Sequence, residues 1–267
     1  MASKAEYEND PADGLPCLKV QEWAQRKHRL LTQYIEASSQ ARKSWPRRTY
    51  IDLYCGPGRC LNQSGGFSDG SPVAAFKASS RAPFTAMYIS DFSRENVGAC
   101  EARLQCLGVS PDVFVGKAED TVHEVVKKMD RGALHLAFLD PFSLHALPFS
   151  VIDQLSAFRK IDFLIHFSVM DFVRNYEKLL LAGTIDQYIP GASLAYRKNK
   201  SLRENRRSAF GIWYQALLAK GYHSSNVEMV RDKGKNMYWL IHATGNQTAL
   251  NIWNDIQARD SQRGFEF

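Results

Sequence analysis

The sequence lacks any apolar run approaching the roughly 18 residues that a membrane-spanning helix needs, and its charged start lacks the apolar core of a signal peptide. Only five cysteines occur among 267 residues, an odd number without paired Cys-x-x-Cys spacing. This usage favours a reducing compartment and disfavours structural zinc. No acids cluster at metal-ligand spacing, so a metal-dependent nuclease or phosphate-transfer enzyme has little support. We therefore expect a cytoplasmic globular protein with no membrane contact and no bound metal.

The composition is otherwise that of a chain that folds around a large core. Apolar residues make up 45% of the sequence and aromatic residues 12%, which supports one large domain or one domain with an insertion. Lysine and arginine number 34 against 28 aspartates and glutamates, for a formal charge of +6. A basic excess of this size suits a polyanion such as a nucleic acid, although many proteins of similar charge bind none.

Strand and helix patterns alternate through most of the chain. We expect residues 1–17 to form a flexible tail and 18–267 to form one domain, which begins with an amphipathic helix over 18–44. A helical, basic insertion is expected at about 172–220, including a helix over 202–220. The expected strands cover 49–54, 84–90, 113–115, 134–139, 161–167, 226–231 and 237–244. One further helix should start at Ser71, and others should cover 95–107, 118–129, about 148–157 and the region around Trp253.

The alternation itself predicts the architecture. Successive parallel strands need crossover connections, so the sheet should be mainly parallel with helices on both faces. The last two strands are close in sequence and predict an antiparallel terminal hairpin. Such a hairpin on a parallel sheet resembles the seven-stranded arrangement of Rossmann-like class I methyltransferases. We therefore predict an α/β chain with that fold.

The first expected strand ends in an acid and breaks into a glycine-rich turn, TYIDLYCGPGRC over residues 49–60. Gly56 and Gly58 let the backbone approach a ligand closely and adopt positive φ. Asp52 could accept a hydrogen bond from a ligand amine or order the turn. Taken alone, a Gly-Pro-Gly turn is equally compatible with a simple exit from a strand. If a cofactor binds here, the expected contacts are Asp52, Tyr54, Cys55, Gly56, Pro57 and Gly58.

Acids also follow the next two expected strands. Asp91 ends the second strand, where a carboxylate can bind both ribose hydroxyls of a nucleoside cofactor. It could also cap the next helix, a role for which Ser93 competes. Glu119 follows the third strand and could lie beside an adenine ring, although an acid favoured by the helix dipole in a first turn is the preferred interpretation.

The fourth expected strand ends in Asp140-Pro141-Phe142, which resembles the Asp-Pro-Pro-Tyr/Phe motif of methyltransferases that act on an amino nitrogen. In that motif the carboxylate and a carbonyl accept the two hydrogens of an exocyclic amine, and the aromatic ring stacks on a base. This chain has one proline where the motif has two. The alternative is a turn with Phe142 in the core. His145 and His166 lie near strand ends and could touch the same substrate, or serve as structural histidines.

A basic stretch, RKNKSLRENRR, covers residues 197–207 and has aromatic residues on both sides. Cations interleaved with aromatic rings suit a phosphate backbone and unstacked bases, whereas a solvated surface is the usual meaning of a charged run. A second basic cluster covers 43–48 around Trp45. The expected substrate contacts in the first stretch are Arg197, Lys198, Lys200, Arg203, Arg206 and Arg207.

Several segments together resemble the three-Cys-motif partner protein family (TcmP) of bacteria. They are YIDLYCGPGR (50–59), DGSPVAAF (69–76), LDPF (139–142), MDFVRN (170–175) and KNMYWLIHAT (235–244), followed by Trp253. The resemblance implies a methyltransferase-like Rossmann fold and a partner protein, radical-SAM-like, that carries the three cysteines. It implies no established reaction. The residues between the glycine turn and Ser71, 61–70, make this loop longer than in ordinary methyltransferases, and they could cover a cofactor pocket or block it.

Two functions remain open at this point. The leading hypothesis is a methyltransferase that uses S-adenosyl-L-methionine to modify an amino group of a nucleic acid, because the glycine turn, Asp91 and Asp140 should meet at one edge of the sheet. The alternative is a non-catalytic binding protein that keeps the fold and serves the three-Cys-motif partner. The sequence leaves the methyl acceptor and the oligomeric state open.

Overall fold

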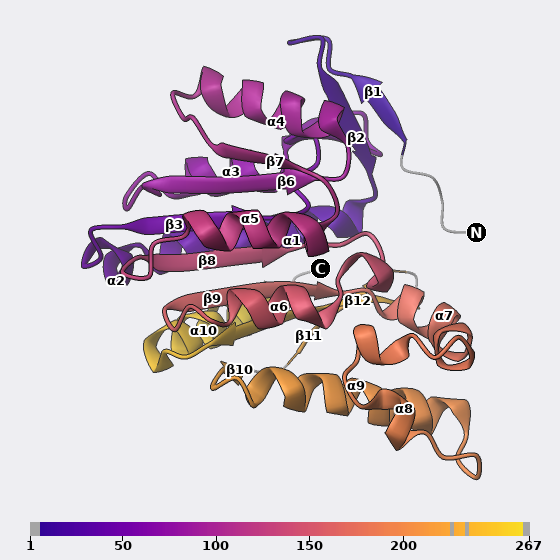
Figure 1. Ribbon diagram of the computed structural model, residues 1–267. Coiled ribbons are helices and arrows are strands. Elements are labelled where there is room, and N and C mark those ends of the chain that lie inside the picture. Colours follow the sequence, from indigo (N-terminus) through magenta and orange to yellow (C-terminus); the bar gives the residue numbers. More distant parts are fainter. Residues whose placement is uncertain (1–5, 225–226, 233–234, 264–267) are drawn as a thin grey trace.

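The computed structural model describes residues 6–224, 227–232 and 235–263. Its main sheet has the strand order β10-β12-β9-β8-β3-β6-β7, and β11 also pairs with β12 (Figure 1). Five central strands run parallel: β3 (Arg48–Asp52), β6 (Ala86–Asp91), β7 (Asp112–Val115), β8 (Leu134–Leu139) and β9 (Ile161–Phe167). β12 (Lys235–Thr244) is antiparallel to β9, and β10 (His223–Ser224) and β11 (Glu228–Asp232) are antiparallel to β12.

This order is that of the Rossmann-like class I methyltransferase fold. β10 and β11 pair with successive parts of β12, so they act as one interrupted edge strand. The sheet is therefore seven-stranded, mainly parallel and completed by an antiparallel hairpin, which confirms the predicted fold class. Asn226, the expected start of one hairpin strand, lies outside the described residues.

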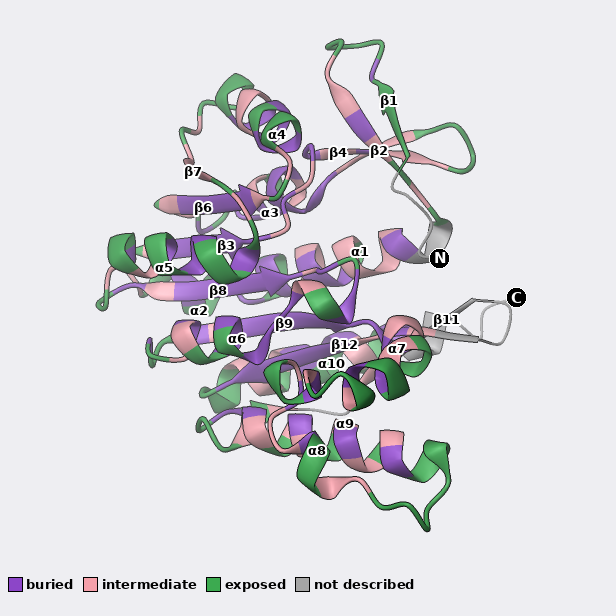
Figure 2. Cartoon of the chain, turned by 45° about the vertical axis from the view of Figure 1, so that its right-hand side comes forward, coloured by how far each residue is buried: buried purple, intermediate pink, exposed green. Residues whose placement is uncertain are grey.

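Helices cover both faces of the sheet, and its central strands β3, β8 and β9 are almost entirely buried (Figure 2). Strands such as β9 are apolar along nearly their whole length because neither face meets water. One face packs against α5 (Ala118–Lys128), α6 (Phe149–Leu155), α7 (Val169–Leu181) and α9 (Leu202–Leu218). The other packs against α1 (Glu22–Ala37), α3 (Ser71–Ala78), α4 (Arg94–Cys106) and α10 (Gln247–Arg263).

The segment expected as a helical insertion packs on the first of these faces. Between α7 and α9 the chain forms a 3-10 turn, Ile185–Gln187, and the short helix α8 (Ala192–Ala195). Trp213 and Leu217 of α9 are buried in the same core as β9, so this segment extends the main domain. In the described part of the chain, no helix is long and apolar enough to cross a membrane.

The N-terminal segment differs from the prediction. From residue 6 onward it is not a flexible tail, because β1 (Tyr7–Asn9) and β2 (Pro16–Val20) join β4 (Arg59–Asn62) and β5 (Phe67–Asp69) in a second sheet, ordered β1-β2-β4-β5. Residues 18–20 are therefore strand, and the helix begins at Glu22. The buried Arg103 of α4 holds the segment, donating to both Asp13 carboxylate oxygens (2.7 and 2.9 Å) and to the carbonyls of Leu15 and Pro16.

The order of the main sheet determines where a ligand should bind. β3 has β6 on one side and β8 on the other, and the chain builds the β6 side before it crosses to β8. The carboxyl ends of β3 and β8 thus flank a topological switch point, where open α/β sheets bind ligands. Asp52 ends β3 and Asp140 follows β8, so two of the predicted site residues lie at this point.

Candidate functional site

The turn after β3 uses its two glycines differently. Both have positive φ, 54° for Gly56 and 76° for Gly58. A Cβ on Gly58 would lie 3.1 Å from Cys100 Sγ and 3.3 Å from a Val73 methyl, so α3 and α4 pack directly against this position. A Cβ on Gly56 would meet no atom within 4 Å. Gly58 is therefore needed for packing, and Gly56 leaves the backbone open to a ligand.

Asp52 is fully buried beneath this turn and orders it. Its carboxylate accepts hydrogen bonds from Tyr50 Oη (3.0 Å), Ser71 Oγ (2.7 Å) and the Tyr54 amide (3.0 Å). Burial raises the pKa of Asp52 to about 7, because these neutral donors only partly offset the lost hydration. The contacts match the second of the two predicted roles, that of holding the turn and the start of α3 together.

Asp91 joins the end of β6 to the same turn. One of its oxygens accepts from the Gly56 amide at 3.1 Å, and the other accepts from the Ser93 amide at 2.9 Å. The helix cap is Ser93, whose Oγ accepts from the Asn96 amide. Asp91 is half-buried, which leaves part of its carboxylate accessible. The structure thus brings Asp91 to the glycine turn, as the ribose-binding interpretation requires.

Glu119 lies in the first turn of α5, as the helix-dipole interpretation expects. Its side chain is 44% exposed and lies 3.6 Å from Lys117 Nζ. It is absent from the lining of the cavity described next. An adenine contact by Glu119 therefore stays a prediction.

A cavity of about 60 Å³ lies at the switch point. The glycine turn forms one side of it, Asp140 lies at the end of β8, and β2 and α1 cover it through Leu18, Val20, Lys27 and His28. Small-molecule sites commonly enclose about 300–1,000 Å³, so a whole nucleoside cofactor needs more room than this conformation provides.

The long segment 61–70 does not fill the cavity. It forms the β4–β5 hairpin, and of its residues only Gly70 lines the cavity wall. The Gly70 amide donates to the Gly58 carbonyl at 2.8 Å, and a Cβ on Gly70 would lie 2.7 Å from the Gly58 carbonyl carbon. The hairpin therefore braces the glycine turn, and access to the cavity depends mainly on β2 and α1.

Asp140 is held by two side chains that the sequence did not connect to it. Lys27 Nζ lies 2.6 and 2.5 Å from its two oxygens, and His166 Nδ1 lies 2.6 Å from Oδ1. Burial disfavours the ionised carboxylate, but Lys27 and His166 outweigh it and hold the pKa of Asp140 below its usual range. Burial lowers the pKa of His166, and its Nδ1 is the ring nitrogen that faces Asp140. Nothing in the sequence distinguished Lys27 from a surface cation on an amphipathic helix.

Pro141 is buried, whereas Phe142 is 83% exposed. The alternative that placed Phe142 in the core is therefore wrong. Phe92, which directly follows Asp91, is also largely exposed, at 73%. Phe92 was not among the predicted site residues, although an aromatic residue directly after a strand-ending acid was a signal for it. Both rings can meet a planar ligand at the carboxyl edge of the sheet.

No family model and no curated protein matches this chain. Solved structures do match. Magnesium protoporphyrin IX methyltransferase of Synechocystis PCC 6803, solved with bound SAM, is 13% identical with a TM-score of 0.42 over 83% of this chain and 81% of that one. An rRNA methylase of Streptococcus thermophilus is 11% identical with a TM-score of 0.42 over 85% and 99%. Protein LPL1258 of Legionella pneumophila is 10% identical with a TM-score of 0.49 over 85% and 87%.

At these identities and TM-scores, the likenesses say nothing about the reaction or ligand of this chain. The fold stands on its own strand order. The resemblance to the three-Cys-motif partner family, which no family model supports, stays a prediction.

The basic stretch 197–207 lies away from the cavity. It spans the loop between α8 and α9 and the first turns of α9, which both views place at the far end of the molecule from β1 and β2 (Figures 1 and 2). Asn205 orders the loop by accepting from the Arg197 amide at 2.9 Å. Arg206 lies 3.9 Å from Glu177. The exposed cations are Arg197, Lys198, Lys200, Arg203 and Arg207.

Cys55 and Cys60 line the cavity, and Cys100 packs against Gly58. Cys55, Cys60 and Cys100 are buried, and burial raises the pKa of the Cys60 thiol to about 12. A thiol in this state is a poor nucleophile. In the described part of the chain, no group of three or more His, Cys, Asp or Glu side chains could hold a metal ion.

Proposed function

We propose that this chain is an S-adenosylmethionine-dependent methyltransferase that modifies an amino group of a nucleic acid. One observation carries the proposal: the glycine turn, Asp91 and Asp140-Pro141-Phe142 end three neighbouring parallel strands at the switch point of this sheet.

The cofactor pocket would use the residues already brought together. The open backbone at Gly56 would receive the methionine part, and Asp91 would bind the ribose hydroxyls. Lys27 lines the cavity and offers a cation to a carboxylate. The bound cofactor would supply the electrophilic methyl group. Because β2 and α1 wall a cavity of only about 60 Å³, binding requires these segments to move outward.

The acceptor amine would be held at the end of β8. Ionised Asp140 accepts hydrogen bonds at about four lone-pair sites, and Lys27 and His166 leave part of this capacity for an amine hydrogen. The exposed ring of Phe142 would stack on the base that carries the amine. The contribution of these residues is orientation, since an amine with an aligned lone pair needs little acid or base help.

The exposed cations of 197–207 support a nucleic acid as the substrate. Each phosphate contact should contribute about one to the slope of log affinity against log salt. Arg203→Gln should therefore lower that slope by about one for a single-stranded oligonucleotide. Lys127→Gln, at an exposed position of α5 outside both basic segments, is the matched control and should leave the slope unchanged.

The second candidate function is a methyltransferase-like binding protein that works with a radical-SAM-like three-Cys-motif partner. The small, covered cavity and the ion pair on Asp140 favour it. The resemblance in sequence is the reason for naming this partner.

Calorimetry with S-adenosylmethionine separates the two candidates. The methyltransferase proposal expects saturable heat and a rise in the unfolding midpoint at millimolar cofactor. Asp140→Asn should then abolish methyl transfer to an oligonucleotide while cofactor affinity changes by a few fold. Absence of heat and of protection would refute cofactor use and favour the binding protein. Transfer that survives in Asp140→Asn would refute the assigned acceptor site alone.

A further inference from the structure

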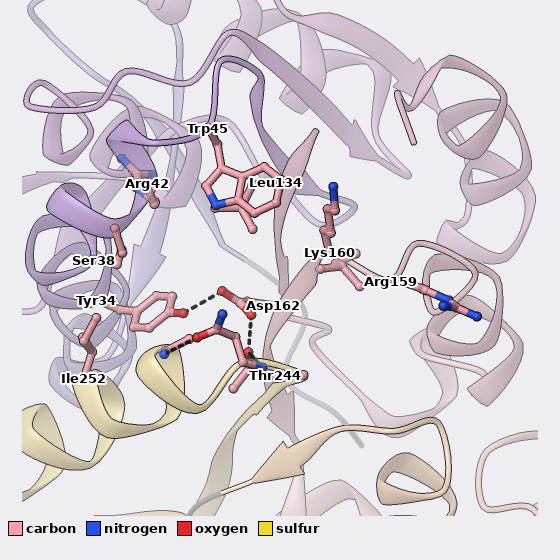
Figure 3. A pocket seen from close by; sticks show the side chains of 15 residues that line it. Tyr34, Ser38, Arg42, Trp45, Leu134, Arg159, Lys160, Asp162, Thr244 and Ile252 are labelled. Atoms are coloured by element: carbon pink, nitrogen blue, oxygen red, sulfur yellow. Dashed lines mark hydrogen bonds between the residues drawn. The ribbon is translucent and has the colours of Figure 1, made fainter. Parts of the chain in front are cut away.

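A second cavity, of about 170 Å³, lies at the edge of the main sheet opposite the glycine turn (Figure 3). Its walls come from α1, from the short helix α2 (Ser39–Lys43), from the amino ends of β8 and β9, and from the junction of β12 with α10. On one side of it, Asp162 accepts hydrogen bonds from Tyr34 Oη at 2.7 Å and from Thr244 Oγ1. Both donors belong to the protein, so this acid is already occupied.

The other charged residues that line this cavity are cations: Arg42, Arg159 and Lys160. Within residues 6–224, 227–232 and 235–263, none of the three forms an ion pair with a carboxylate. Lys160 Nζ lies 4.4 Å from the centre of the Trp45 ring instead. Figure 3 shows Arg42 and Lys160 on either side of Trp45, whereas the Arg159 side chain extends away from it. The cavity thus has an excess of positive charge.

Arg42 is the one of these cations that has buried hydrogen-bond donors without an acceptor among the described residues. It is only 5% exposed, and its one hydrogen-bond acceptor is the Ala82 carbonyl, 2.5 Å from Nη2. Its Nε and Nη1 are buried and have no acceptor among the described residues. The guanidinium also lies 4.6 Å from the centre of the Phe84 ring. A buried cation without a counter-ion is costly, so an anion in the cavity that Arg42 lines would supply missing negative charge.

Apolar side chains form another part of the lining, beside polar residues such as Ser38 and Asn246. Leu134, Ile161, Ala249 and Ile252 face the cavity together with the Trp45 ring. An apolar protein cavity of about 150 Å³ holds one benzene molecule, so the space here suits a body of about that size. Arg42 lies in the last turn of α2, where the helix dipole alone favours a cation. Lys160 and Trp45 lie outside that helix, so the dipole does not account for their presence in the lining.

We infer that this cavity binds a small organic anion, a carboxylate or phosphate ester on an apolar body about the size of a benzene ring. Lys160 attracts the anionic group directly, Arg42 adds positive charge from within the wall, and Trp45, Leu134 and Ile161 pack around the body. This site is separate from the proposed methyltransferase site, since the two cavities share no residue and lie at opposite edges of the sheet.

Calorimetric titration of the full chain tests the inference with benzoate, phenyl phosphate and the uncharged benzamide. The anions should bind at millimolar concentration or below, and benzamide should bind at least about tenfold more weakly. Lys160→Met should weaken the anions by about tenfold. Lys43→Met is the matched control, because Lys43 is an exposed cation on α2 outside the cavity lining, and it should leave binding unchanged.

A filled cavity provides the second arm. Ala249→Leu should abolish binding without a change in charge, and Ala41→Leu, at an exposed lining position, serves the same purpose if Ala249→Leu fails to fold. Binding of benzoate alone or of phenyl phosphate alone would support the site and identify the anionic group. Absence of binding by both anions, equal binding of benzamide, or unchanged binding in Lys160→Met would overturn it.

Discussion

Asp52 at the end of β3 is buried and Asp140 after β8 is largely buried, and their pKa values shift in opposite directions. Asp52 meets only uncharged donors, two hydroxyls and an amide, and burial raises its pKa to about 7. Asp140 meets the ammonium of Lys27 and the imidazole of His166, and its pKa lies below the usual range despite burial. At the end of β3, hydrogen bonds from neutral donors do not offset the rise in pKa that burial causes. At the end of β8, the nearby cation Lys27 helps to more than offset it.

The difference has a structural consequence. The end of β3 is held by backbone geometry and packing, with glycines where α3 and α4 approach closely. The end of β8 is held by charge, through a lysine on a helix far away in sequence. A ligand at the switch point therefore meets a neutral, rigid wall on one side and an ionic network on the other. We expect substitutions at the two strand ends to differ in how much stability they remove and in how that loss depends on pH.

The largest effect is expected from Lys27→Met. The Lys27 and Asp140 side chains are 12% and 11% exposed, so the substitution leaves a largely buried carboxylate without its ammonium partner. Removing one partner of a buried ion pair costs about 3–5 kcal/mol. Urea unfolding at neutral pH measures this loss. Lys19→Met, which removes an exposed cation paired with Glu8, is the control and should leave the midpoint close to that of the unchanged protein. Equal effects of the two substitutions would contradict the ionic account of the β8 end.

Asp52→Asn should change how stability depends on pH. The folded-state pKa of about 7 exceeds the ordinary value of 3.8, so the folded state binds more protons than the unfolded state between these values. This stabilisation is fully present below about pH 4 and is lost as pH rises through 7, with a total of about 4 kcal/mol. Asparagine keeps the size of the side chain and removes the titration. Unfolding free energies from pH 4 to 8 should therefore decline less steeply in the variant.

Asp140→Asn is the control, because the pKa of Asp140 is shifted in the opposite direction to that of Asp52. Its depressed pKa gives stability that is present above the unfolded value of about 3.8 and is lost as pH falls below it. Asp140→Asn should leave the decline between pH 4 and 7 in place and reduce the acid loss instead. An identical pH profile for the two asparagine variants would show that the two carboxyls titrate alike.

The sequence was sufficient for the main sheet because the information there is local. Mostly apolar runs such as 134–139 and 161–167 are followed by polar or turn residues, and the strands of the structure match them. Residues 6–17 were misjudged for the same reason. Their Pro11, Gly14 and Pro16 are typical of a loop, and the strands there depend on pairing with β4 and on Arg103.

The candidate site was predictable only in part. Asp52, Asp91 and Asp140 were found because acids at the ends of parallel strands must gather at one edge. The pairing of Lys27 with Asp140 was not, since it joins residues 113 positions apart through the packing of α1 on the sheet. The exposure of Phe142 also depends on tertiary structure, because the same Asp-Pro-Phe sequence could turn the ring inward.

Gly58→Ala tests the rigid end of the comparison. The left-handed backbone costs an alanine about 1 kcal/mol, and contacts of 3.1–3.3 Å with Cys100 and Val73 add about 1–3 kcal/mol of overpacking. Gly56→Ala has the same backbone cost without the contacts, so it should lose only about 1 kcal/mol. Chemical denaturation of the two variants measures the difference. Equal losses would mean that α3 and α4 can shift away from the turn.

The smallest effect is expected from Ser71→Ala, the neutral counterpart of Lys27→Met. Ser71 Oγ donates to Asp52 at 2.7 Å, and the helix cap is Gly70, so the substitution removes this one hydrogen bond and no capping contact. A neutral donor contributes about 1 kcal/mol. The loss should be greater at pH 8 than at pH 5, because Ser71 stabilises the ionised form of Asp52. Ser80→Ala, at an exposed position beyond α3, controls for the loss of a hydroxyl. A loss that is independent of pH would show that Ser71 acts through packing alone and that its hydroxyl does not stabilise the ionised carboxylate of Asp52.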